Sequence, residues 1–272
     1  MSAAPLTETP FDTGGVRLAG FSRGTGATLV FQHGLLGDHH QVAEAVPDLP
    51  GLRLLTLDCR GHGTSDAKGP FSIAQFAEDV IALVEARAKG PVVLGGISMG
   101  AAIASRIAVR RPDLVRGLVL ARPAWVTEAA PENMQPNAEV GALLETLPAG
   151  EARARFERSS TAARLRAGAP DNLSSLMGFF ARAPQDPTAR LLTAISADGP
   201  GITEADLAAL RVPTLVLSSE DDLIHPVSHA ATLAALIPGA RHTPLTPKGR
   251  DKAAYLRDFH AALAAFLSEL PQ

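Results

Sequence analysis

The sequence of 272 residues is poor in cysteine and in net charge, and each shortage excludes a class of protein. A single cysteine, Cys59, rules out an intramolecular disulfide, a CxxC redox pair and a cysteine-based zinc site. The formal net charge is −3, and the lysines and arginines are scattered, so the basic stripe typical of nucleic-acid binding is missing. We therefore expect a small-molecule substrate and no nucleic-acid partner.

Long hydrophobic segments are missing too. Nowhere do about 18 uncharged apolar residues follow one another, so no membrane-spanning helix is predicted. The first ten residues hold no basic run followed by an apolar stretch of signal-peptide length. Together with the lone cysteine, these absences lead us to expect a cytoplasmic protein without a membrane partner. They give no expectation for the oligomeric state.

What is present is a hydrophobic content of 46%, arranged as short apolar runs that alternate with longer segments of helical period. The helical segments cover residues 72–87, 99–109 and 251–267, and Ser72 is suited to cap the first of them. This alternation predicts an α/β fold with a mostly parallel sheet flanked by helices. The apolar runs expected to form buried strands are residues 28–31, 52–57, 92–94, 118–120 and 214–217.

The alternation breaks between residues 122 and 210, where prolines are followed by arginine-rich helical segments without a clear strand. We interpret residues 122–210 as a helical lid inserted after the sixth strand, and residues 1–121 and 211–272 as the core domain. Five arginines between positions 153 and 166 suit a patch for an anionic substrate. Their helical spacing and the glutamates between them favour a solvent-exposed face instead.

The strongest chemical signal is the GxSxG pattern at residues 96–100, preceded by an apolar strand and followed by a helical segment. A serine on a tight strand-to-helix turn has strained backbone geometry, which requires glycine at two neighbouring positions. The start of the following helix stabilises negative charge. A chance GxSxG explains the pentapeptide alone, but not its placement between strand and helix. We therefore predict Ser98 as a nucleophile.

Together with this GxSxG turn, three further segments resemble the α/β-hydrolase family. They are His33-Gly34 after an early strand, residues 58–66 (DCRGHGTSD), and residues 213–226. The resemblance implies an oxyanion hole formed by the backbone amides of Leu35 and Met99. It also implies a loop-positioning role for His33.

The same resemblance selects the acid. The family's acid stands four residues before a proline, and Asp222 has this spacing to Pro226. The neighbouring Asp221 and Glu220 are one and two residues early, so we expect them to be ordinary loop charges.

The resemblance fails at the catalytic histidine. Arg250 stands where the family has histidine, and an arginine stays protonated and is no general base. Lys248 would need a strongly lowered pKa to take that role. We predict that His225, three residues after Asp222, is the replacement base. A substrate-binding role for His225 is about equally well supported, and His242 is the next candidate base.

These residues indicate a serine hydrolase acting on an ester, lactone or thioester of a small apolar-to-amphipathic substrate, with neither metal nor organic cofactor. Two alternatives remain open: a cofactor-free lyase or cyclase in which Ser98 only donates a hydrogen bond, and a non-catalytic ligand-binding pseudoenzyme. Whether Ser98 can be activated separates them. We expect His39 and His40 to lie near the pocket. The lid is expected to line the pocket with apolar side chains, or these side chains pack only against the core. They are Trp125, Met134, Met177, Phe179 and Phe180.

Overall fold

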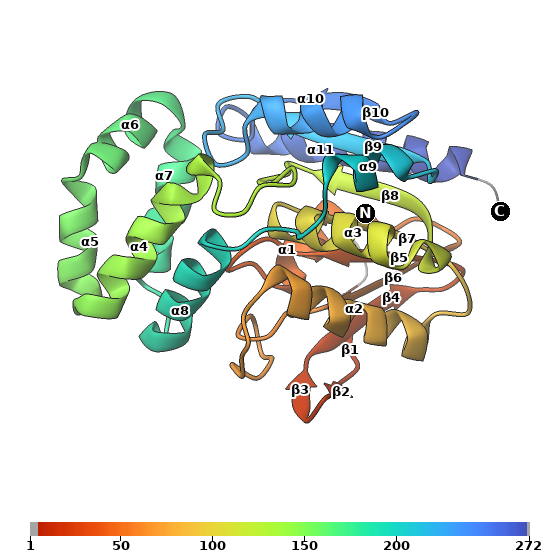
Figure 1. The fold of residues 1–272 in the computed structure, drawn as a ribbon, viewed down its shortest axis with the longest axis horizontal. Coiled ribbons are helices and arrows are strands. Elements are labelled where there is room, and N and C mark those ends of the chain that lie inside the picture. The colour runs from red at the N-terminus through yellow and green to blue at the C-terminus, as the bar shows by residue number, and fades with distance from the viewer. Residues whose placement is uncertain (1–4, 271–272) are drawn as a thin grey trace.

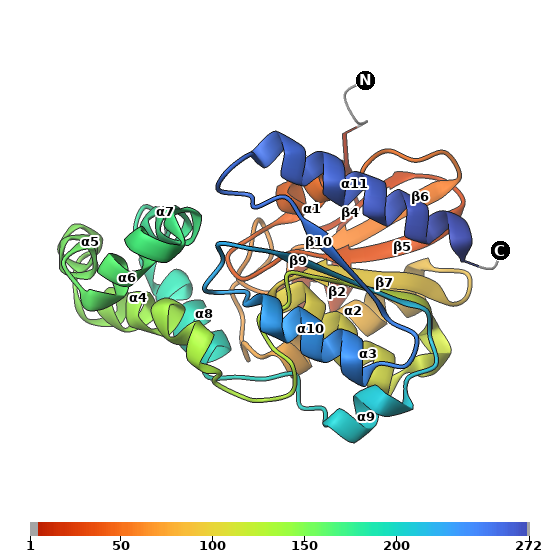
Figure 2. The same cartoon turned by 90° about the horizontal axis from the view of Figure 1, so that it is seen from above.

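A computed structural model describes residues 5–270 and contains an eight-stranded sheet with helices on both faces (Figures 1 and 2). The strand order is β1-β4-β6-β5-β7-β8-β9-β10. The pairs that join β6, β5, β7, β8, β9 and β10 are parallel, whereas β4 is antiparallel to both β1 and β6. The sheet strands are β1 (Thr7–Glu8), β4 (Gly20–Gly24), β5 (Ala27–Gln32), β6 (Leu52–Leu57), β7 (Val92–Ile97), β8 (Val115–Ala121), β9 (Thr214–Ser219) and β10 (Arg241–Leu245), and a separate hairpin joins β2 (Phe11–Thr13) and β3 (Val16–Leu18).

The predicted mostly parallel sheet is confirmed, and its central strands are buried on both faces. All six residues of β7 are buried, which explains why such strands read as continuous apolar runs. Each predicted strand lies within an observed one. The run at 92–94 stops three residues short of the end of β7 because Gly95 and Gly96 carry no side chain that marks a strand.

The helices form a layer on each side of the sheet (Figure 2). On one face α1 and α11 pack with Leu29, Val93 and Leu215, and on the other α2, α3 and α10 pack with the alternate strand residues. The predicted cap is confirmed, because Ser72 Oγ accepts from the Gln75 N–H at 3.0 Å. The helices are α1 (His39–Ala45), α2 (Ile73–Arg87), α3 (Met99–Arg110), α4 (Gln135–Thr146), α5 (Ala149–Glu157), α6 (Ser160–Gly168), α7 (Pro170–Phe179), α8 (Gln185–Ser196), α9 (Glu204–Ala209), α10 (Val227–Leu236) and α11 (Lys252–Glu269), with 3₁₀ turns η1 (Pro112–Leu114) and η2 (Glu132–Met134).

The strands at the beginning of the chain, β1 to β4, are absent from the sequence prediction. They are two to five residues long and contain glycine and charged residues, so no apolar run marks them. β4 is held by its antiparallel pairing with β6, which is a long-range contact. Local sequence pattern carries little information about such strands.

Residues 122–210 contain helices and 3₁₀ turns and no strand, as predicted. Helices α4 to α8 form a lobe beside the sheet (Figures 1 and 2). α9, at the end of this range, packs against α3 and α10. Over residues 5–270, no helix combines the length and the apolar character that crossing a membrane requires.

Candidate active site

Ser98 occupies the turn between β7 and α3, in left-handed backbone geometry with φ 58°. The glycines on either side are required by close approach. A Cβ on Gly96 would lie 2.4 Å from the carbonyl carbon of Gly100, and one on Gly100 would lie 2.3 Å from the Gln32 carbonyl oxygen. The elbow predicted from the sequence is therefore present, and its strain is fixed by the packing of β5, β7 and α3.

A cavity of about 170 Å³ lies over this turn, between the sheet and the helical lobe. Ser98, Leu35 and His225 line it from the core. The lobe contributes apolar and amide side chains: Met134, Asn137, Asn172, Leu176 and Phe179. The cavity thus brings together segments that are far apart in the chain, and its size suits a small molecule.

The predicted oxyanion loop lies beside Ser98. A Cβ on Gly34 would be only 3.3 Å from Ser98 Cβ, which places the backbone of this loop against the nucleophile. Leu35 lines the cavity, whereas the Met99 side chain is fully buried in the core at the start of α3. Of Met99, the group available beside Ser98 as an oxyanion donor is therefore the backbone amide and not the side chain.

His33 and Gln41 hold that loop in place. The His33 Nε2 accepts from the Cys59 N–H at 3.0 Å, so its Nδ1–H donates to the Gly34 carbonyl at 2.8 Å. Burial lowers the pKa of His33, in agreement with this neutral ring. Gln41 Oε1 accepts from the Gly34 N–H at 2.7 Å. No motif pointed to Gln41, because its role depends on α1 folding back over the loop.

Asp222 and His225 form a pair on the loop after β9. Both carboxylate oxygens of Asp222 lie 2.9 Å from His225 Nδ1, and its Oδ1 also accepts the His225 backbone N–H at 3.0 Å. An ionised carboxylate only accepts, so Nδ1 carries the proton and Nε2 keeps its lone pair. The arrangement fixes the tautomer that a general base needs.

Arg122, which no sequence motif indicated, binds to Asp222 of this pair. It follows β8 directly, with φ 43°, and donates from Nε and Nη2 to Asp222 Oδ2 at 2.9 and 2.5 Å. Its guanidinium also lies 5.8 Å from the centre of the Tyr255 ring. Position 122 is 100 residues from Asp222 in the chain, so no local sequence pattern predicts the contact.

The electrostatics of this group keep Asp222 ionised and His225 neutral. Burial alone would raise the pKa of Asp222, but the charges and hydrogen bonds of His225 and Arg122 hold it well below its usual range. Burial lowers the pKa of His225, and the positive charges of Arg122 and Lys248 add to this against the opposing effect of Asp222. A neutral histidine beside an ionised acid is therefore the state at neutral pH.

Ser98 Oγ makes no hydrogen bond to His225 or to any other residue between positions 5 and 270. The structure therefore brings Ser98 and His225 to one cavity, with Asp222 held against His225, without closing the link between serine and histidine.

The two cations of the loop after β10 differ in their surroundings. Arg250, at the position expected for histidine, is exposed and pairs with Asp221 at 2.5 and 3.0 Å, outside the cavity lining. Lys248 lines the cavity, partly buried, and pairs with Asp171 of α7 at 3.1 Å. Lys248 is thus placed at the cavity, whereas Arg250 is not.

The other candidate histidines lie outside the cavity lining. His242 is exposed, and its Nε2 is 2.8 Å from Ser218 Oγ. His39 stacks on Phe21 and contacts Asp58 at 3.1 Å, while His40 is exposed.

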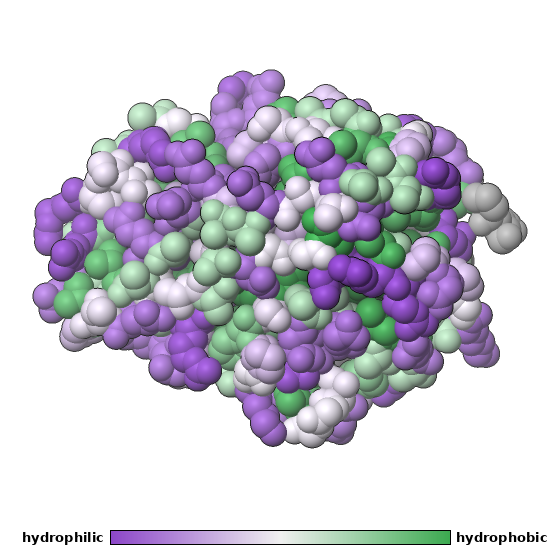
Figure 3. All heavy atoms as spheres, in the orientation of Figure 1, coloured by the Kyte–Doolittle hydropathy of each residue, from purple (hydrophilic) through white to green (hydrophobic). Residues whose placement is uncertain are grey.

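Only part of the predicted apolar lining contributes to the cavity. Met134 and Phe179 line it, whereas Met177 and Phe180 do not. Trp125 is buried in the core, where its Nε1–H donates to the Asp198 carbonyl at 2.9 Å, so its predicted contact with substrate is not supported. The five arginines of residues 153–166 are exposed and do not line the cavity, and hydrophilic residues cover much of the visible lobe (Figure 3).

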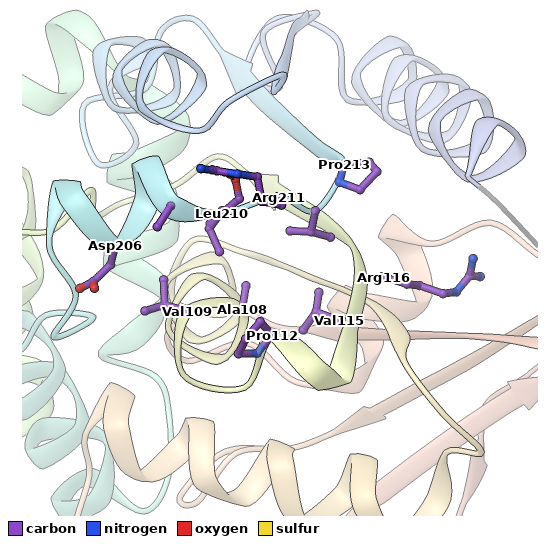
Figure 4. A pocket seen from close by; sticks show the side chains of 11 residues that line it. Ala108, Val109, Pro112, Val115, Arg116, Asp206, Leu210, Arg211 and Pro213 are labelled. Atoms are coloured by element: carbon purple, nitrogen blue, oxygen red, sulfur yellow. Dashed lines mark hydrogen bonds between the residues drawn. The ribbon is translucent and has the colours of Figure 1, made fainter.

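A larger cavity of about 520 Å³ lies at the opposite end of the strands, near the starts of β8 and β9 (Figure 4). Val115, Arg116 and Pro213 contribute to it. Its lining includes Asp206 but neither serine, cysteine nor histidine, so it offers no serine or cysteine nucleophile with a histidine base. The smaller cavity at Ser98 is the candidate active site.

Comparisons with known proteins agree with this geometry. Mouse sn-1-specific diacylglycerol lipase ABHD11 is 33% identical over 126 residues, 45% of this chain and 39% of the lipase, so the chain spans less than two fifths of that relative. The AB hydrolase superfamily protein YisY of Bacillus subtilis is 26% identical over 239 residues, covering 83% of this chain and 85% of YisY.

The crystal structure of the enol-lactonase from Burkholderia xenovorans LB400 superposes with a TM-score of 0.71 at 24% identity, covering 96% of this chain and all of the other. At that identity the likeness shows the fold. The model of the α/β-hydrolase fold family matches residues 27–249, which include the elbow, the oxyanion loop and the acid loop. The chain therefore belongs to the α/β-hydrolase fold family.

Proposed function

We propose that the protein is a serine hydrolase that cleaves a small ester, lactone or thioester, with Ser98 as nucleophile, His225 as base and Asp222 as the group that orients it. The observation that carries the proposal is the Asp222–His225 pair, with Nδ1 at 2.9 Å from both carboxylate oxygens, whose histidine lines the same cavity as Ser98. A fixed tautomer with a free Nε2 is what a serine requires for activation.

In the proposed reaction His225 Nε2 takes the Ser98 hydroxyl proton while Oγ forms a bond to the substrate carbonyl carbon. The amides of Leu35 and Met99 donate to the resulting oxyanion. Collapse of the tetrahedral species breaks the bond to the leaving group, which receives the proton from His225. Water then repeats the sequence on the acyl-serine and releases the acid. The missing Ser98–His225 hydrogen bond is expected to form with substrate, since such contacts are often long without ligand.

A fluorophosphonate probe tests the nucleophile directly. Wild-type protein is expected to be labelled at Ser98, and the Ser98→Ala variant is expected to remain unlabelled. His225→Ala should slow labelling and ester turnover by about 10²–10⁴-fold, as expected for a positioned general base. His242→Ala is the matched control and should be nearly silent. Wild-type labelling rates in a folded His225→Ala protein would rule out this triad.

A second candidate is favoured by the same missing hydrogen bond: a cofactor-free lyase or cyclase in which His225 moves a proton and Ser98 only donates to an enolate oxygen. It predicts no phosphonate adduct at Ser98, although the cavity would still bind substrate. Complete absence of labelling over long exposure, in a protein that melts cooperatively, would favour it over the hydrolase.

A further inference from the structure

One wall of the cavity consists of hydrogen-bond donors. Asn172, in the first turn of α7, is only 4% exposed and lines the cavity. Its Oδ1 accepts from the backbone N–H groups of Leu223 and Ile224 at 2.8 and 3.2 Å, which assigns the oxygen to that side. Its Nδ2 has no partner among residues 5–270. Because Asn172 lines the cavity, an occupant of the cavity can supply the acceptor that this NH₂ group lacks within the protein.

Lys248 adds further donors at the same wall. Its ammonium has three N–H groups, and one contact, to Asp171 Oδ2 at 3.1 Å, is present. Asp171 itself does not line the cavity, and neither does any other aspartate or glutamate of the described chain. Lys248 and Asn172 thus bring donors to a cavity lining that holds no carboxylate, although Asp171 already accepts from one N–H of Lys248.

The start of α7 strengthens this wall. The helix runs over Pro170–Phe179, and no side chain caps its N-terminus. Asp171, in the first turn, already places one negative charge at the positive end of the helix dipole, and the Asn172 amide beside it favours a further acceptor. Arg122 lines the same cavity, but Asp222 balances its charge.

We propose that this wall binds a carboxylate of the substrate, so that the preferred substrates are short esters or lactones carrying a carboxylate group. The inference rests on the proposed hydrolase function and narrows its substrate class. The volume of about 170 Å³ is close to that of a cavity that holds one benzene ring, which limits the substrate to a short chain.

Two esters of matched shape test the proposal: monomethyl glutarate, and methyl 5-methylhexanoate, in which an isopropyl group replaces the carboxylate. Turnover is followed in a pH-stat at neutral pH. We expect kcat/KM to be at least about tenfold higher for the glutarate ester, as for a charge-assisted hydrogen bond. Equal or better turnover of the neutral ester would overturn the carboxylate assignment while leaving the hydrolase intact.

Asn172→Asp is the sharpest variant. It keeps an oxygen for the Leu223 and Ile224 N–H groups and replaces the free NH₂ by a negative oxygen. We expect the ratio of kcat/KM for the glutarate ester to kcat/KM for the neutral ester to fall about tenfold or more. Lys248→Met should weaken the preference in the same direction, and the exposed Lys89→Met is the control for loss of one charge. An unchanged preference in both wall variants would contradict the inference.

Binding separates this inference from the proposed function. Glutarate is titrated calorimetrically into wild-type, Ser98→Ala and Asn172→Asp proteins. Binding by the first two and loss of binding by the third support the wall even if no ester is hydrolysed, in which case only the hydrolase proposal fails. If wild-type protein does not bind glutarate, or if Asn172→Asp binds it equally well, the proposed carboxylate site is wrong even if Ser98 reacts with a fluorophosphonate.

Discussion

Arg122 is expected to set the pH at which His225 becomes active. Its Nη2 lies 3.3 Å from His225 Nδ1, and both side chains are almost fully buried. A positive charge at this distance disfavours the imidazolium, so Arg122 lowers the pKa of His225. Arg122→Gln removes the charge and keeps an N–H that can donate to Asp222.

The magnitude follows from the distance. Two unit charges about 4 Å apart interact by about 4 kcal/mol at an effective dielectric constant near 20, which corresponds to about three pKa units. Water entering the space left by the shorter side chain screens part of this. The other groups near His225, namely Asp222, Lys248 and His229, are unchanged. We therefore expect the pKa of His225 to rise by about one to two units in Arg122→Gln.

The assay is the pH profile of kcat/KM on a good ester. His225 works as the neutral base, so the rate falls as pH drops through its pKa, which in the wild type lies below 6.5. In Arg122→Gln this acidic limb should move up by about one to two pH units. Arg122→Lys keeps a charge and should leave the limb near its wild-type position. Thermal melting at each pH verifies that both variants are folded.

An acidic limb that stays in place, or moves to lower pH, in folded Arg122→Gln would refute the reasoning. It would mean either that His225 is not the titrating base or that Arg122 does not act on it electrostatically. A uniform loss of rate with an unchanged profile would assign Arg122 to the positioning of Asp222 alone.

Other parts of the molecule give further expectations. Gly96→Ala should lower the free energy of unfolding by about 1–3 kcal/mol through a backbone clash, whereas Gly150→Ala, with nothing near its Cβ, should not; equal melting temperatures would contradict this. Asp79 pairs with the buried Arg60 at 2.7 and 2.8 Å, so Asp79→Ala leaves that charge unpaired and should lower the free energy of unfolding in urea by about 3–5 kcal/mol. Asp113→Ala, which removes the partner of Arg111 in an exposed pair, should lower it far less. Arg250→His should neither raise ester turnover nor rescue His225→Ala, because position 250 is exposed and outside the cavity; rescue would show that the loop after β10 can still reach Ser98.

The parts of this protein that depend on neighbouring residues were predictable. The glycines around Ser98 are dictated by a turn within five residues, the Ser72 cap by one turn of helix, and the spacing of Asp222 to Pro226 by one loop. The buried parallel strands contain continuous apolar runs because both of their faces are covered.

Contacts between distant segments were decided by the tertiary structure alone. Arg122 meets Asp222 across 100 positions, Asn172 reaches Leu223 across 51, and Gln41 folds back onto Gly34 only because α1 packs against the sheet. Trp125 was expected to line the pocket because it is a large apolar side chain of the lid, but it is buried in the core. The sequence determines local backbone geometry and which faces are apolar, since these depend on adjacent residues. Which side chains share one cavity depends on how the lobe and the sheet pack, and that is fixed only when the whole chain folds.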